Sequence, residues 1–442
     1  MLNVFRPLTE RQILFLIVLV ALSLRISFAI YSASHIPENT WAFGYEPGSI
    51  GRSIAVGDGF SSPFDEPSGP TAWMMPLYPL LLALVFKLFG VYSLNAALAI
   101  FTLNSVFSAL TCIPLYRIAK SCFGRIVGYI AASSLAVYPV ALFHAGHIWE
   151  TSLFALLATW LLAWLLSLPK GFNFRSALLY GVFSGFIALV NPVIIAFSPF
   201  AAMWLFTESD APKKQRFRLI GTIFIAMILT LMPWIVRNYI VFGELILRSN
   251  FGLELRLGNS PEAWSADKAR RMAPWSLGHP ATSREEFLRY ASLGEVEYMN
   301  RAFNDAVAFI RDNPEKFLWL SLQRIEQFWL NDFSGKDENK KTLGLPFSVA
   351  GIAQIIYILP VPFMLWGIVL ALRRKIGVAP LFFFILSIPA VYYVTHAGLT
   401  RYRYPIEPMI ILFASFGVYS LFLMVRRRIF AQYKLSGLAV EG

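Results

Sequence analysis

The chain has 442 residues, of which 57% are hydrophobic and only 14% are charged. So much apolar surface exceeds what a single soluble core can bury, which excludes an ordinary soluble protein and indicates a polytopic membrane protein. A net charge of +12 fits either a nucleic-acid-binding protein or a membrane topology signal, so the positions of the basic residues decide between these two.

Ten apolar runs are long enough to cross a bilayer. They are residues 12–33, 95–116, 126–143, 151–168, 176–190, 193–206, 219–236, 347–372, 378–394 and 404–425. With the N-terminus in the cytoplasm, the connections on that side and the two chain ends hold 18 of the 38 basic residues, whereas the short outer loops have almost none. The positive charge is therefore a topology signal, and no nucleic-acid partner is expected. The first run is interpreted as a retained anchor.

The first outer segment, residues 34–94, contains the first candidate site residue. Glu46 lies in WAFGYEPGSI, where the chain leaves the membrane. Aromatic neighbours, Tyr45 among them, would shield its carboxylate and raise its pKa, as a general base requires; a solvated turn carboxylate is the alternative. A short helix is expected at 49–56. Residues 75–91 are interpreted as a helix along the outer surface, because an eleventh crossing would put half of the basic loops on the wrong side.

The second outer turn carries His144, His147 and Glu150 in HAGHIWE. The spacing of three would place all of them on one helical face, which suits zinc or manganese; ordinary hydrogen bonding at the membrane interface is the alternative. Glu150 by itself is a candidate for binding sugar hydroxyls or a neighbouring arginine. Asn191, at the next outer turn, is a candidate contact to an anionic headgroup or a structural residue.

The long polar segment 238–346 is expected to form a small, mostly helical outer domain between two transmembrane modules, 1–237 and 347–442. Ser283 with Glu286 predicts the start of a helix at 283–311, and Pro314 the start of an amphipathic helix at 314–330. Its apolar residues are expected at the lipid interface: Phe317, Leu318, Leu320, Ile325, Phe328 and Trp329. Arg237 and Asn259 are candidate contacts to anionic headgroups; a snorkelling or structural role is the alternative.

The last outer connection reads LTRYRYPIEP, residues 399–408. Arg401 and Arg403 are the only basic residues in any short outer connection, so they break the charge bias of the rest of the chain. If this segment is extended, alternation places both guanidinium groups on one side, as a clamp on a phosphate or pyrophosphate. Tyr402, between them, is included in this substrate-binding set. Binding of ordinary lipid headgroups, or pairing with Glu407, is the alternative.

Several motifs together resemble a known family. They are IAVGDGFSSPF at 54–64, PLYPLLLA at 76–83, WIVRNYIVFG at 234–243, LGN at 257–259 and RYRYPIEP at 401–408. The set is similar to the membrane glycosyltransferases of the GT-C superfamily, family 39, which includes the lipid A aminoarabinose transferase and the protein O-mannosyltransferases. The fold this implies is all-α and polytopic: a GT-C-like bundle of about ten transmembrane helices, with juxtamembrane helices in the first outer loop and the small outer domain.

The resemblance implies inverting transfer of a sugar from a polyprenyl-phosphate-linked donor to an acceptor hydroxyl, on the outer face of what would be a bacterial inner membrane. Glu46 corresponds to the residue that activates the acceptor, with Asp58 held in reserve. Glu150 matches the family's acidic residue at the second outer turn, and Arg401 and Arg403 match its basic residues at the last one. No cofactor is implied with certainty, although a divalent cation is possible, and the acceptor is left open among lipid, glycan and protein.

Two other classes of function stay open at the level of sequence. A lipid-linked sugar flippase or another secondary transporter also needs cations at interface depth, although transporters commonly have paired repeats and broken helices near the midplane. A non-catalytic membrane scaffold would leave the exceptional Arg401 and Arg403 without a role. The chain has no P-loop, zincin helix or dinucleotide fingerprint, which disfavours a nucleotide-driven pump.

Overall fold

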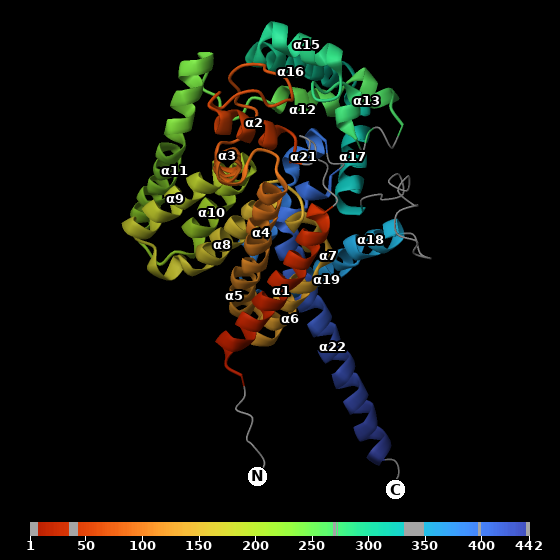
Figure 1. Cartoon of the computed structure of the whole chain (residues 1–442). Helices are drawn as coiled ribbons and strands as arrows, with labels where there is room; N and C mark the ends of the chain where they lie inside the picture. Colours follow the sequence, from red (N-terminus) through yellow and green to blue (C-terminus); the bar gives the residue numbers. More distant parts are fainter. Residues whose placement is uncertain are drawn as a thin grey trace.

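The computed structural model describes residues 8–34, 43–267, 271, 273–330, 349–396 and 399–438. These residues form helices and turns, with one isolated bridge between Ser61 and Pro70. A bundle of long helices makes up the body of the molecule, and shorter helices cover one end of it (Figure 1). Helix α1 (Glu10–Ala33) begins, and α22 (Glu407–Leu438) ends, at the opposite end. The expected all-α fold is confirmed. Trp41, an expected neighbour of Glu46, lies outside the described residues.

Five helical segments of the described chain are long and apolar enough to cross a membrane. They are Glu10–Ala33, Leu94–Phe123 (α4, Leu94–Leu110, with α5, Cys112–Phe123), Lys213–Phe242 (α11), Gln354–Arg373 (α18, Val349–Ile358, with α19, Pro360–Arg373) and Thr400–Ile429. Each coincides with a predicted span, and the segments make the chain an integral membrane protein.

The third predicted span is a bent pair, α6 (Arg125–Val137) and α7 (Pro139–Ala145), at 51° to each other. Tyr138 has an extended conformation with ψ of 117°, as expected for a residue that precedes proline. The pair counts as a sixth span if the two helices are taken together. The sequence predicts a span at 126–143 and says nothing of this bend.

The other predicted spans correspond to shorter apolar helices. They are α8 (Thr151–Ser167), α9 (Phe174–Ala188), η2 (Pro192–Phe197) with α10 (Ser198–Glu208), and α20 (Ala379–Ser387) with α21 (Ala390–Val394). Ten crossings therefore stays a prediction. The apolar faces of these helices meet in one large cluster that includes Leu135, Phe154 and Leu412, each at most 1% exposed.

Arg25, in the middle of α1, satisfies the backbone groups that the bend in α6 and α7 frees. It is fully buried, and its guanidinium donates to the carbonyl oxygens of Ala136 and Leu135 at 2.8 and 2.9 Å. Its Nε donates to Ser108 Oγ at 2.7 Å, and Ser108 Oγ lies 2.8 Å from the hydroxyl of Tyr404. The buried guanidinium thus supplies hydrogen-bond donors to carbonyl oxygens that water cannot reach.

The first outer segment contains α2 (Glu46–Val56) and α3 (Leu77–Phe89). Helix α2 includes the predicted 49–56 helix and starts three residues earlier, at Glu46. Helix α3 has 13 residues, so its length is about 20 Å, less than the apolar thickness of a bilayer. It packs against α2 and α4. A helix within residues 75–91 is thus confirmed, and its position along the outer surface stays a prediction.

The second outer segment begins after α11 and contains a group of short helices. These are α12 (Phe251–Gly258), α13 (Pro261–Ser265), η3 (Pro274–Leu277), α15 (Arg284–Leu293), α16 (Glu295–Asp312) and α17 (Pro314–Leu330). The single predicted helix 283–311 is wrong: Gly294, with φ of 79°, ends α15 and α16 starts after it. The predicted cap is present, because Ser283 Oγ accepts from the Glu286 N–H at 3.3 Å.

Helix α17 has the predicted bounds, but two of its expected lipid-facing residues are buried. Leu320 is 3% and Phe328 1% exposed, whereas Leu318 on another face is 61% exposed. One face of α17 packs against α16, α18 and α21. Leu320 and Phe328 therefore face the protein, and Leu318 faces outward.

The two outer segments share a hydrophobic cluster, although they are far apart in sequence. Tyr45 and Trp73 of the first pack with Leu253, Tyr290 and Met299 of the second, together with further apolar residues. Glu295, at the start of α16, accepts from Thr71 Oγ1 at 2.5 Å and from the Ala72 N–H at 2.6 Å. The division into modules at residues 237 and 346 stays a prediction, and α11 continues to Phe242.

Candidate active site

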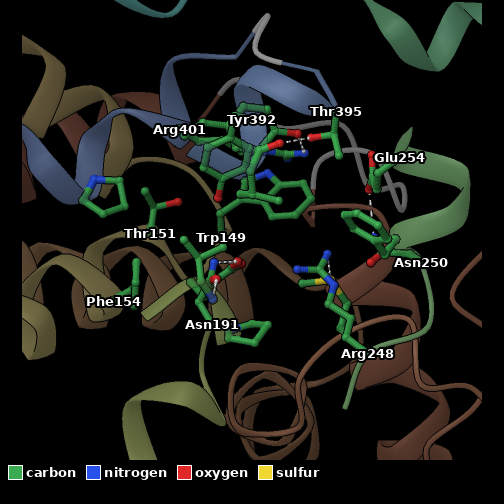
Figure 2. A pocket seen from close by; sticks show the side chains of 18 of the residues that line it. Trp149, Thr151, Phe154, Asn191, Arg248, Asn250, Glu254, Tyr392, Thr395 and Arg401 are labelled. Atoms are coloured by element: carbon green, nitrogen blue, oxygen red, sulfur yellow. Dashed lines mark hydrogen bonds between the residues drawn. The ribbon is translucent and has the colours of Figure 1, made fainter. Parts of the chain in front are cut away.

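A cavity of about 210 Å³ opens between the membrane bundle and the outer helices. The first outer segment, the turns before α8 and before η2, α12, and the connection between α21 and α22 all contribute to its wall. Five of the predicted site residues line it: Glu46, Glu150, Asn191, Arg401 and Tyr402. In Figure 2, Arg401 and Trp149 lie on one side of the open centre, and Arg248 and Asn250 lie on another.

The backbone before α2 places Glu46 at the first position of that helix. Tyr45 has φ of 57° and Gly44 has φ of 82°; a positive φ at a tyrosine is strained and needs support from packing. The Tyr45 hydroxyl donates to the Ala281 carbonyl at 3.1 Å. A Cβ at Gly44 would lie 2.0 Å from the Ile148 carbonyl oxygen. Glycine at 44 therefore permits the first outer segment to pack directly on the turn that carries Trp149 and Glu150.

The Glu46 carboxyl group is largely withdrawn from water, with 15% of its side chain exposed. Burial raises its pKa to about 7, although the positive charge of Arg401 and the backbone N–H of the helix start act in the opposite direction. At neutral pH the group is therefore divided between its acid and its carboxylate form. This is the property that a general base operating near pH 7 requires.

His279 lies beside Glu46, with its Nε2 at 3.8 Å from Glu46 Oε1. Burial lowers the pKa of His279 to about 4, so the imidazole is neutral at pH 7. Its Nδ1 accepts from the Ala281 N–H at 3.0 Å, which places the ring proton on Nε2, the nitrogen that faces Glu46. His279 thus presents a neutral N–H, and not a competing positive charge, to the carboxyl group.

Arg401 presents a cation to the same cavity. Its guanidinium lies 3.6 Å from the centre of the Trp149 ring and donates to the Tyr402 hydroxyl at 3.3 Å. The Tyr402 ring in turn stacks on Tyr392 at 4.3 Å. Within the described part of the chain, Arg401 has no salt bridge to a carboxylate. An aromatic platform therefore holds the guanidinium while its charge stays available to an anion.

Glu150 and Asn191 form a second polar patch on the wall. Asn191 Nδ2 donates to Glu150 Oε1 at 3.3 Å, and Asn191 Oδ1 accepts from the Val193 N–H at 3.1 Å. The other oxygen, Glu150 Oε2, is buried without a hydrogen-bond partner among the described residues. A buried acceptor left open in this way suits a hydroxyl donor of a ligand.

Sequence reasoning missed three charged or titratable residues of the wall: Arg248, Glu254 and His396. Arg248 Nε donates to the Trp73 carbonyl at 2.9 Å. Glu254 pairs with His396 Nε2; burial would raise the pKa of Glu254, but the charge and hydrogen bond of His396 lower it to about 2. Nothing in the local sequence distinguishes Arg248 and Glu254 from the other charges of the outer segment, which has nearly equal numbers of basic and acidic residues.

A close approach of backbones brings Glu254 and His396 together. A Cβ at Gly258 would lie 1.6 Å from the Thr395 carbonyl oxygen, so only glycine lets α12 pack on this segment. Asn259, one of the predicted ligand contacts, donates to the Val394 carbonyl at 2.8 Å and is fully buried. Arg324 donates to the carbonyls of Gly258 and Tyr393 at 2.6 and 2.8 Å. Asn259 therefore holds the wall together and does not line the cavity.

Arg403 does not join Arg401 in the cavity. It is fully buried, pairs with Glu407 at 2.8 Å, and donates to the carbonyls of Trp329 and Tyr357 at 3.0 and 2.8 Å. The segment is not extended, because Thr400–Tyr402 and Tyr404–Ile406 are 3₁₀ helices, η5 and η6. With three residues per turn, residues i and i+2 point in different directions. The two arginines therefore face separate environments.

The remaining candidates also lie outside the cavity wall. Arg237 donates to the carbonyls of Thr71 and Phe60 at 2.7 and 2.9 Å and so ties the first outer segment to the end of α11. Asp58 is exposed in the turn after α2. Tyr45 is 6% exposed within the shared cluster of the outer segments.

The histidines of HAGHIWE do not assemble into a metal site. His144 is buried with its ring 4.7 Å from that of Tyr404, and His147 Nδ1 lies 2.7 Å from the Phe143 carbonyl. Among the described residues there is no group of three or more His, Cys, Asp or Glu side chains that could hold a metal ion.

Comparisons with known proteins agree with this architecture. Residues 66–235 match the sequence model of the dolichyl-phosphate-mannose-protein mannosyltransferases. The apo oligosaccharyltransferase of Archaeoglobus fulgidus superposes with a TM-score of 0.52 at 16% identity, over 96% of this chain and 52% of that chain. The chain thus spans about half the length of that enzyme. A comparison with curated protein sequences gives no significant match.

Two further solved structures are similar at lower scores. The A. fulgidus oligosaccharyltransferase AglB in complex with an inhibitory peptide and a dolichol-phosphate has a TM-score of 0.49 at 18% identity, over 92% of this chain and 51% of that chain. ArnT from Cupriavidus metallidurans bound to undecaprenyl phosphate has a TM-score of 0.45 at 13% identity, over 93% of this chain and 78% of that chain.

Proposed function

Residues 66–235 match the mannosyltransferase sequence model and the fold resembles that of an oligosaccharyltransferase, and on this basis we propose that the chain is a GT-C membrane glycosyltransferase. In this proposal it transfers a sugar from a polyprenyl-phosphate-linked donor to an acceptor hydroxyl. The reaction takes place at the outer face of the membrane, with inversion at the anomeric carbon. The donor class is inferred from the family resemblance. The membrane face is inferred from the same resemblance and from the distribution of basic residues among the loops. AglB has been solved in complex with a dolichol-phosphate and ArnT bound to undecaprenyl phosphate, which is in keeping with this donor class.

Glu46 is the proposed general base. Its carboxylate takes the proton of the acceptor hydroxyl as that oxygen forms a bond to C1 of the sugar. The bond between C1 and the phosphate oxygen breaks at the same time, and the electron pair leaves with the phosphate. Because phosphate is a good leaving group, the donor side needs a stabilised anion and no proton.

Arg401 is the proposed cation for that anion. Its guanidinium is held over Trp149. The attraction between the guanidinium and the leaving phosphate becomes stronger in the transition state, because negative charge develops on the phosphate. Arg248, on the other side of the cavity (Figure 2), adds a second positive charge. Glu150, with one oxygen left open, is assigned to a sugar hydroxyl.

One observation supports this proposal most directly: Glu46 and Arg401, about 355 residues apart in the chain, line the same cavity and influence each other's charge. A base and a phosphate-binding cation in one partly closed space are the minimum that the reaction needs. A scaffold protein would need neither.

The test is a transfer assay with the purified full-length chain in detergent. Radiolabelled undecaprenyl-phosphate-linked pentoses and hexoses are supplied with acceptor fractions of envelope lipid, glycan and protein, and the labelled product is separated. Transfer by the wild type that disappears in Glu46→Gln supports the proposal. No transfer from any donor, combined with movement of the labelled lipid across proteoliposomes, would instead favour the flippase alternative.

A further inference from the structure

A second hollow, of about 730 Å³, lies along the other end of α8. The first turn of α8 lines the active-site cavity with Thr151 and Phe154, whereas its last turns line this groove with Trp160 and Trp164. Ten residues separate Phe154 from Trp164, which corresponds to about 15 Å along the helix. The groove is therefore a separate site and no extension of the cavity.

The groove lies at the end of the molecule where α1 begins. Arg117 of its wall is on α5, one turn before Lys120, and Lys120 Nζ lies 2.7 Å from Glu10 Oε1 at the start of α1. The distribution of basic residues predicts that this end faces the cytoplasm. The groove is thus expected at the membrane surface opposite to the proposed sugar transfer.

The chemistry of the wall combines two cations with aromatic and aliphatic side chains. The Arg117 guanidinium lies 4.8 Å from the centre of the Trp160 ring, and Lys170, in the 3₁₀ turn η1 (Pro169–Gly171), supplies the other charge. The rest of the wall is Ile118, Ser121, Ala163, Trp164, Leu166, Ser167 and Phe183. None of the described residues that line it is acidic, so the two charges are not neutralised within the groove.

We propose that this groove binds an anionic phospholipid of the cytoplasmic leaflet. The lipid phosphate lies between Arg117 and Lys170, and an acyl chain runs along Trp164 and Phe183. Tryptophan and basic side chains are both typical of the depth of the lipid headgroups, so their combination indicates a site at that depth. A lipid fits better than a soluble anion because most of the wall is apolar, and an apolar wall contributes affinity only to a ligand with a hydrocarbon part.

Native mass spectrometry of the delipidated full-length protein tests this proposal. The protein is titrated with phosphatidylglycerol and, separately, with phosphatidylcholine. The wild type is expected to bind one phosphatidylglycerol more tightly than any phosphatidylcholine. Arg117→Ala combined with Lys170→Ala is expected to weaken that binding about 10- to 30-fold, because each basic residue near an anionic surface contributes about a fivefold change in affinity.

Lys213→Ala with Arg218→Ala is the matched control, because it removes the same two residue types from exposed positions at the start of α11, outside the groove. This control variant should bind phosphatidylglycerol with the same affinity as the wild type. Ser167→Glu is a second variant that keeps both cations and adds a repelling charge to the wall, and it should weaken binding as well. Thermal melting checks that each variant is folded.

Three results would overturn the proposal. The first is equal binding of phosphatidylglycerol by the groove variants and the control. The second is binding of phosphatidylcholine as tight as that of phosphatidylglycerol. The third is displacement of the lipid by soluble glycerol phosphate at similar concentration, which would reveal an ion site. None of these results depends on whether the chain transfers sugars.

Discussion

Arg401 and Arg403 are two residues apart, yet they belong to two regions of opposite character. Around Arg401 the cavity leaves polar groups with incomplete partners: a guanidinium on an indole ring, an open oxygen of Glu150, and a carboxyl group whose pKa burial raises to about 7. Around Arg403 a fully buried network pairs the charge with Glu407 and with two carbonyl oxygens. The first region has a cavity beside its charged groups, whereas in the second the positive charge is neutralised by an internal carboxylate.

This difference shows that residue type and position in a loop do not distinguish a binding residue from a structural one. Both arginines break the charge bias of the outer loops, and both are next to tyrosines. What separates them is the 3₁₀ geometry of η5 and η6. A measurement that separates binding from stability should therefore give opposite results at the two positions.

The largest expected effect is on stability, at Arg403. Arg403→Met leaves Glu407 buried without its partner, so we expect the free energy of unfolding to fall by about 3–5 kcal/mol, measured as thermal or denaturant unfolding in detergent. Replacing both residues, Arg403→Met with Glu407→Met, removes the unpaired charge and should recover at least half of the loss. Wild-type stability of the single variant would show that the network is not structural.

The next effect is on turnover, at Glu46. Glu46→Gln should lower the turnover number about 100-fold or more, since positioned general bases contribute two to four powers of ten, while donor binding stays nearly unchanged. Asp58→Asn is the matched control, because Asp58 is exposed and outside the cavity; we expect its turnover to stay within about twofold of wild type. If the two variants exchanged these results, the base would be Asp58.

Arg401 should affect donor affinity with little change in stability. Arg401→Ala removes one charge-assisted contact, worth about 1.5–3 kcal/mol, so the apparent affinity for the polyprenyl-phosphate donor should fall about 10- to 100-fold. Arg401→Lys keeps the charge but not the forked geometry and should be intermediate. Titration of the undecaprenyl-phosphate lipid against intrinsic tryptophan fluorescence, with Trp149 beside the guanidinium, measures this directly. Unchanged affinity in both variants would exclude Arg401 from the donor site.

The smallest effect is the dependence on pH. With the pKa of Glu46 at about 7, the ionised base is half of the population at pH 7 and about a tenth at pH 6, so turnover should fall about fivefold over that unit and level off above pH 8. The stability effect has the opposite sign. The pKa rises from the ordinary 4.5 to about 7, so the folded state disfavours the carboxylate: stability falls as pH rises between these values and stays lower above pH 7. Glu46→Gln should therefore be the more stable protein at pH 7 and above. A flat rate profile between pH 6 and 8 would contradict this assignment.

Much of the fold was predictable because lipid imposes a simple rule on sequence: apolar runs, flanked by basic residues on one side, become helices. Glu46, Glu150, Asn191, Arg401 and Tyr402 line one cavity, in agreement with their predicted positions in outer segments next to membrane spans. The sequence did not reveal the break at Gly294, which required one residue to adopt a positive φ inside a helical pattern. Glu254 and His396 were missed because the packing of α12 on residue 395 brings them together. Arg248 was missed because it is positioned by a hydrogen bond to the Trp73 carbonyl, far away in the sequence.

The polar node around Arg25 has a mechanical consequence. A transmembrane helix that breaks in its middle usually acts as a hinge, because its loose carbonyls can exchange partners. Here the Arg25 guanidinium donates to two carbonyls in the last turn of α6, and Ser108 extends the connection to Tyr404 in the last outer connection. These carbonyls are therefore occupied, and the network joins α1, α4 and α6 to the connection that carries Arg401 and Tyr402.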